Sequence, residues 1–326
     1  MTGHIPSPAL KRDGIGRLAA QWQKFLAAAS VAMLGAAGPA AAQNLNIDRI
    51  ADRALSTLGF VVVPARGAPF LSFADIDGTQ NSFRSGQVGG GFNPVKGSPF
   101  YLEGYIGYQS YEPEFLLRTP LRDVDVDAEW QGIAATAGFG WDFPLAENWV
   151  FRPILNLSYG RASADATITG TAPDDEDLNF LIDGDINAGG YGASLVLAYE
   201  RFEARRDVEF SLRYTDMLLV PLGSASDLDA EARVTTATAW GRLRYPIRNW
   251  QAFGEPVKSV FQASLSAFPG DQGDVVDLPW VARVGVGIQI GTEKTGVPLI
   301  SATRLMVSYS FSDNYDAVGI GLGLSF

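Results

Sequence analysis

Apolar and polar residues alternate with a period of two along most of this chain, most clearly in its last twelve residues, 315–326. They read YDAVGIGLGLSF, so that one side holds Val, Ile, Leu and Phe while the other holds Gly and Ser. A period of two is that of a β-strand, whose successive side chains point to opposite faces. Because a soluble sheet would carry charge on its outer face, this pattern indicates lipid on one side and a crowded interior on the other.

The same alternation recurs in segments separated by turn signals from Pro69 onward, each about ten residues long, as transmembrane barrel strands are. Two of them, 81–92 and 230–245, alternate poorly, and their registers stay open. The sequence therefore predicts an all-β fold, a transmembrane antiparallel β-barrel. The predicted strands are 69–77, 81–92, 99–110, 128–142, 148–160, 187–201, 207–220, 230–245, 255–268, 278–291, 300–311 and 315–326.

An even number of strands, with the carboxy terminus on the periplasmic side, sets the predicted orientation of this barrel, and the loop lengths agree with it. With an even number of strands, alternate connections face the same side, and the longest ones, 111–127 and 161–186, fall in one set. Barrels of this kind have short periplasmic turns and long outer loops, so we expect the long set to face outward. The predicted periplasmic connections are 93–98, 143–147, 202–206, 246–254 and 292–299, and the outer ones are 78–80, 111–127, 161–186, 221–229, 269–277 and 312–314.

Aromatic residues gather near both rims of the predicted barrel, where amphipathic rings sit at headgroup level. The periplasmic band holds Trp141, Phe143, Trp149, Tyr245, Trp250 and Phe326, and the outer band Tyr108, Tyr159, Trp280, Phe311 and Tyr315.

The amino-terminal part divides into two predicted pieces before the barrel of 69–326. Residues 1–42 have a basic segment, an Ala-rich apolar run and small residues before Gln43, which are the marks of a secretory signal peptide. Residues 43–68 hold a linker and a short amphipathic helix, which we expect to lie in or against the lumen of the barrel. We expect Asn46 to cap the start of the helix and Gly59 its end, with 60–63 extended.

Composition narrows the function classes. The chain has no cysteine, so an exported domain must be held by other means, and a closed hydrogen-bonded barrel suffices. The formal net charge is −11, and becomes −14 once the signal segment is removed. Such acidity argues against nucleic acid as a partner.

The terminal aromatic strand, the strand number and the preceding helix together resemble the translocator barrel of autotransporters. The resemblance covers 69–326, plus 46–59 for the helix. It implies a lipid-embedded barrel in the bacterial outer membrane, whose Phe326 is read as an assembly signal by the barrel assembly machinery. The family's large passenger domain is missing from this sequence, which therefore resembles a solitary, passenger-less translocator.

The sequence gives little support for a catalytic site or a ligand-binding site. The one histidine, His4, lies in the signal segment, and the mature chain lacks the proton-exchanging group that outer-membrane lipases and proteases use, so we expect no enzyme activity. The acidic run within 161–186 suits hard cations, but without ordered ligand spacing a solvated loop is the favoured interpretation. Gly89-Gly90-Gly91 lacks the Lys and helix of a phosphate loop, and indicates close strand packing. We expect no metal and no cofactor.

The inward face of the predicted strands carries charges of both signs. Charges inside a barrel must meet water or each other. They are consistent either with a wet channel whose selectivity they set or with an ion-pair network that fills a narrow barrel. The residues are Glu103, Arg152, Glu200, Glu209, Arg213, Arg283 and Arg304.

The sequence thus predicts an autotransporter-like barrel acting as a pore or an envelope structural element. A porin-like diffusion channel and an adhesin that uses the acidic outer loops are the alternatives. The oligomeric state, the solute and any passenger stay open.

Overall fold

The computed structural model describes residues 47–66, 71–76, 82–95, 97–112, 114–118, 123–169, 184–223, 230–292, 294, 301–313 and 315–325. The predicted signal segment and Phe326 lie outside these residues, as do 170–183 of the acidic outer connection.

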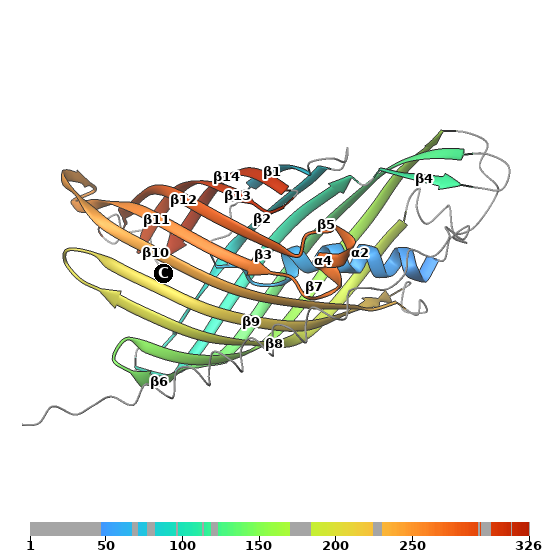
Figure 1. Cartoon of the computed structure of the whole chain (residues 1–326). Coiled ribbons are helices and arrows are strands. Elements are labelled where there is room, and N and C mark those ends of the chain that lie inside the picture. Colours follow the sequence, from blue (N-terminus) through green and yellow to red (C-terminus); the bar gives the residue numbers. More distant parts are fainter. Residues whose placement is uncertain are drawn as a thin grey trace, which may run out of the picture. The chain divides into compact units, whose positions relative to one another are not determined.

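In this part of the chain one antiparallel sheet holds 14 strands (Figure 1). Two of them, β4 (Glu114–Arg118) and β6 (Phe143–Ala146), are short arms that pair at the ends of longer strands. The barrel strands are β1 (Leu71–Ile76), β2 (Ser82–Phe92), β3 (Phe100–Glu112), β5 (Asp123–Trp141), β7 (Trp149–Thr169), β8 (Gly184–Phe202), β9 (Asp207–Leu222), β10 (Ala232–Ala252), β11 (Glu255–Ala267), β12 (Trp280–Gly291), β13 (Ala302–Phe311) and β14 (Tyr315–Ser325).

Each of these twelve strands pairs with its neighbour in the sequence, and β1 pairs with β14 so that the sheet closes. Leu71 faces Ile320 and Ile76 faces Tyr315 across the closing pair. Closure gives each of these twelve strands a partner on both sides, which is the condition for a sheet to stand in hydrocarbon. The predicted all-β barrel of twelve strands is therefore confirmed.

The outside of the barrel is apolar and exposed. Ile133, Leu157 and Val286 have 55%, 57% and 56% of their surface accessible, although each has two neighbouring strands. Next to each of them along the strand is a buried residue, namely Gly132, Asn156 and Gly285, as the alternation predicted. A continuous apolar exterior of this kind has to be covered by lipid, because water would leave it unfavourably hydrated.

Several connections are shorter than predicted, because the strands run further. The region 111–127 holds the end of β3, all of β4 and the start of β5, and the 246–254 connection shrinks to a turn. Phe253 and Gly254 form that turn with φ of 56° and 76°. Two consecutive positive φ values match the twist of a tight hairpin, which lets β10 and β11 pair almost to their ends. Tyr315 also departs from its predicted outer band, since its side chain is buried and lines an interior space with Phe83 and Arg283.

Two helices lie among the strands. α2 (Ile47–Val62) precedes the barrel, and α4 (Asp271–Val275) belongs to the connection between β11 and β12. α2 contacts β2, β3, β5, β7, β8, β9 and β10, so it is surrounded by the wall and lies inside the barrel (Figure 1). Neither helix, nor any other in the described residues, has the length and apolar character needed to cross a membrane.

Candidate functional site

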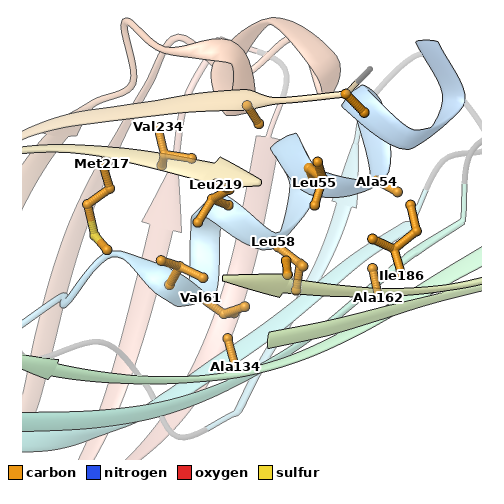
Figure 2. Packing of buried hydrophobic residues seen from close by; sticks show 14 of the residues in the cluster. Ala54, Leu55, Leu58, Val61, Ala134, Ala162, Ile186, Met217, Leu219 and Val234 are labelled. Carbon is orange, nitrogen blue, oxygen red and sulfur yellow. The ribbon is translucent and has the colours of Figure 1, made fainter. Parts of the chain in front are cut away.

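The candidate site is the barrel interior around α2. The apolar face of the helix is fully buried: Leu55, Leu58 and Val61 have at most 1% of their surface exposed. Figure 2 shows these side chains pointing toward the inner faces of several strands. A single leucine buried in this way stabilises by about 1.5–3 kcal/mol. The contacting wall residues include Ala134, Ala162, Ile186, Ala188, Met217, Leu219, Ala232 and Val234.

Small residues on the wall make room for the helix. A Cβ added to Gly107 of β3 would lie 2.6 Å from Val61 Cβ, and one added to Gly132 of β5 would lie 2.8 Å from Leu58 Cδ2. Both distances are below van der Waals contact, so only glycine admits the helix at these positions. The bare inward positions that the sequence shows on these strands therefore form a seat for α2.

Gly59 shows the same close fit from the helix side, and corrects a prediction. We expected Gly59 to end the helix, but α2 continues to Val62. A Cβ at Gly59 would lie 2.7 Å from Val234 Cγ1, so the glycine serves close packing against β10 rather than a left-handed cap. The helix ends instead just before Pro64, which lacks the N–H that would continue it.

Side chains of the wall bond the end of the helix. The Nε2 of Gln87 donates to the carbonyls of Val61 (2.9 Å) and Val63 (3.0 Å), and its Oε1 accepts from Ala65 N (2.7 Å). The hydroxyl of Thr136 donates to Val62 O at 2.7 Å. The last carbonyls of a helix have no partner within it, and burying them unpaired is costly. Gln87 and Thr136 therefore fasten this end of α2 to β2 and β5.

The other end of the helix is fastened at the mouth with the long connections. Asp52 Oδ1 accepts a hydrogen bond from Glu231 N, just before β10, at 2.9 Å. The connection that carries α4 packs against the carboxy-terminal half of the helix, where Phe60 meets Phe268 edge to face at 5.2 Å. Buried Gln272 joins it to β10 by donating to Thr235 O at 2.7 Å. Both ends of α2 are thus tied to the barrel.

Below the helix, polar side chains fill the middle of the barrel. Glu103 of β3 pairs with Arg213 of β9, whose Nη2 also donates to Ser194 Oγ at 2.8 Å. Ser194 in turn accepts from Asn156 Nδ2 at 2.7 Å. The network spans β3, β7, β8 and β9, and leaves a cavity of about 30 Å³ beside Tyr101. This is roughly the space of one water molecule in the liquid.

The seven charged residues predicted to face the interior fall into several groups. Glu103 and Arg213 meet each other. Arg152 pairs with Asp142 and stacks on Tyr101, and Glu200 pairs with Arg66 at 3.3 Å. The remaining three have partners on adjacent strands: Glu209 with Arg242 and Arg244, Arg283 with Ser310, and Arg304 with Gln289.

Several residues of the barrel interior were not predicted from the sequence. Arg242 and Arg244 alternate with outward Leu243, yet they fall in 230–245, a segment that alternates poorly overall. Asp207 has the same parity as Glu209, and this signal alone would have placed it inside. Nothing in the sequence around Gln87 indicates its role, since that role depends on where the helix ends.

A metal centre has no counterpart in the residues described: no group of three or more His, Cys, Asp or Glu side chains gathers there. Of the acidic run 161–186, Asp185 pairs with Arg161 at 2.5 Å, while Asp174, Asp175, Glu176, Asp177 and Asp183 lie outside the described residues. The glycines 89–91 lie within β2. Tyr105 packs against the position where a Gly89 Cβ would stand, as close strand packing predicts.

Comparison with known proteins gives structural neighbours and no sequence relatives. No protein-family model matches the chain, and no curated protein sequence does. Among solved structures, the chain is similar to the β domain of the Bordetella autotransporter BrkA, with 13% identity and a TM-score of 0.45 over 79% of this chain and 97% of that one.

Two further autotransporter structures match at the same level. The translocator domain of NalP from Neisseria meningitidis is 13% identical, with a TM-score of 0.44 over 78% of this chain and 86% of that one. The transport unit of AIDA-I from Escherichia coli is 11% identical, with a TM-score of 0.44 over 86% and 99%. The functional argument below is drawn from the geometry of the chain itself.

Proposed function

We propose that this chain is an outer-membrane barrel of the translocator type whose pore is closed by its own helix α2. The observation that carries the proposal is the seat of α2: an apolar face with at most 1% exposure at Leu55, Leu58 and Val61, held by wall residues from seven strands. A porin-like open lumen would need water where these side chains pack.

The direction of the helix supports a translocator rather than a simple plug. Asp52, near its start, bonds to the connection between β9 and β10, one of those predicted to face outward. Its end bonds to Gln87 in the middle of β2, and β1 is the next strand along the chain. The helix therefore runs inward from the outer mouth. This is the polarity of a segment whose amino-terminal side has passed through the pore.

Planar-bilayer conductance of the refolded mature chain tests the proposal. Full-length protein starting at Gln43 should stay closed or conduct in brief openings, whereas a chain starting at Val61 should conduct steadily. Leu58→Arg should behave like the shortened chain, because a buried guanidinium without a partner costs several kcal/mol and expels the helix. Arg53→Ala, which changes an exposed side chain of the same helix, is the matched control and should stay closed.

Two results would contradict the proposal. Steady conductance of the full chain would favour the porin-like channel. Equal closure of the full and shortened chains would place the block in the side chains below the helix, leaving an envelope structural element or an adhesin.

A further inference from the structure

A second interior space lies on the other side of the α2 linker. It is a cavity of about 690 Å³ between Ala65 and Arg66, which cover it toward the helix, and the strand ends near the short connections. At that end the cavity is lined by Phe202, Asp207 and Glu255, which stand at the ends of β8, β9 and β11. The volume falls within the range of about 300–1,000 Å³ typical of sites for small ligands.

The lining of this cavity is rich in cations although the chain is acidic. Five cations stand against four carboxylates, in a chain with a net charge of −11. One of the carboxylates, Glu255, is neutralised from outside the lining by Lys294 at 2.8 Å. The cations are Arg66, Arg242, Arg244, Lys258 and Arg304, and the carboxylates are Glu200, Asp207, Glu209 and Glu255.

The other three carboxylates are already engaged. Glu200 pairs with Arg66 at 3.3 Å, and Asp207 with Lys258 at 2.7 Å. Glu209 is shared between Arg244, at 3.0 Å, and Arg242, at 3.5 Å. Arg244 also approaches Asp207 at 3.3 Å, so that two carboxylates, Asp207 and Glu209, are shared among three cations of β10 and β11.

Arg242 shows most directly that the lining is rich in cations. Its side chain is 7% exposed, and its Nε donates no hydrogen bond to any residue that the structure describes. Nη2 donates to the neutral amide of Gln262 at 3.2 Å, and the guanidinium stacks on Trp240 at 4.5 Å. A buried N–H without a partner is costly, and an anionic oxygen is the acceptor that would satisfy it best.

Arg304 lies three strands away and adds a second guanidinium. Its Nε donates to the neutral Gln289 amide at 3.2 Å, and Gly323 beside it leaves the wall bare: a Cβ there would lie 3.0 Å from Arg304 Nη1. Guanidinium groups bind carboxylate and phosphate oxygens through paired N–H donors.

We propose that this cavity binds a small multivalent oxyanion, a phosphate or a di- or tricarboxylate, with Arg242 and Arg304 as its main donors. The site opens toward the end of the barrel with the short connections. It adjoins the helix seat through Gln87, while the partners named above for Arg242 and Arg304 lie on strands of the wall.

Calorimetric titration of inorganic phosphate into the refolded full chain, in an uncharged detergent at low ionic strength, tests the site. We expect saturable binding that is at least ten-fold weaker in Arg242→Gln and in Arg304→Gln. Arg161→Gln removes an exposed guanidinium near the other end of the barrel, and should bind as the unchanged chain does. Absence of saturable binding, or equal affinity in all four proteins, would overturn the proposal.

A variant of opposite sign guards against loss of binding through misfolding. Glu209→Gln removes a competing carboxylate and should tighten phosphate binding at least three-fold, provided that the heat-modifiable gel shift shows a folded barrel. Unchanged or weaker binding by folded Glu209→Gln would contradict the site. Citrate and a short-chain phosphatidylglycerol serve as competitors: displacement by citrate alone assigns a free anion, and displacement by the lipid assigns a headgroup phosphate.

Discussion

The carboxylate of Glu103 meets the guanidinium of Arg213 across the interior of the barrel, with Oε1 2.6 Å from Nη2. Their strands, β3 and β9, are separated in the sheet by β5, β7 and β8. The pair therefore bridges the wall from one side to another instead of joining neighbours. Both side chains are buried, and this closes the barrel below the helix on that side.

Breaking this bridge should be costly. Glu103→Gln leaves the Arg213 guanidinium buried without its counter-charge, and the free energy of unfolding should fall by about 3–5 kcal/mol. Urea titration of the refolded protein, followed by gel mobility, measures the change. Arg161→Gln breaks an exposed pair and should alter stability little. If Glu103→Gln is as stable as that control, the bridge is absent in the membrane.

The lipid face should reject charge. Leu212→Arg places a guanidinium on the exposed outer face of β9, and should lower the free energy of unfolding by about 2–4 kcal/mol if the position lies near the bilayer midplane. Leu212→Ala separates the loss of apolar surface from the charge. An arginine variant as stable as the alanine variant in lipid would show that this face meets water.

The positions of the strands could be predicted from the sequence because each strand has one apolar face toward lipid. The outward row Ile133, Phe139 and Trp141 is apolar without interruption, and alternation with small inward residues fixes its register. The residues at which the strands end were predicted less well. The pairing of β10 with β11 continues to Ala252 because the 253–254 turn permits it, and no polarity change marks that point.

The interior was predicted less well than the exterior. The position of a charged residue in the two-residue repeat shows in the sequence whether its side chain faces inward. The residue with which it pairs depends on how the barrel closes. Glu103 and Arg213 are 110 residues apart, and nothing local joins them. Helix contacts are equally non-local: Gly59 resembled a helix end, and its actual role becomes visible only beside Val234.

The contact between Gly59 and Val234 gives a paired prediction. Gly59→Ala adds a Cβ 2.7 Å from Val234 Cγ1, so it should loosen the helix and raise the open fraction of the channel in bilayers. Val234→Ala removes both γ-carbons, and the double variant should recover most of the closed state. If the double variant conducts as much as Gly59→Ala alone, the helix and β10 are not in contact in the membrane.

The role of Phe326 stays a prediction from the sequence, because this residue lies outside those that the structure describes. We propose that it is read by the barrel assembly machinery, because in the sequence it continues the alternation of Ile320, Leu322 and Leu324. A chain ending at Ser325 should reach the outer membrane in smaller amount and show less of the heat-modifiable folded form than the full chain. Equal amounts of both would refute a role for the terminal aromatic residue.

The place of α2 inside the barrel is tested most directly by a disulfide, since the chain has no cysteine of its own. Leu58 Cδ2 lies 2.8 Å from where a Gly132 Cβ would stand. Shortening Leu58 to cysteine removes the atom that fills this gap, and the two Cβ atoms of a disulfide are typically about 3.8 Å apart. The double variant Leu58→Cys/Gly132→Cys should therefore cross-link in native membranes, as read by mass spectrometry of the linked peptides. Leu58→Cys/Ile133→Cys, whose second cysteine is on the opposite face of the same strand, should stay reduced. A cross-link in neither variant, or to the same extent in both, would contradict a helix seated inside the barrel.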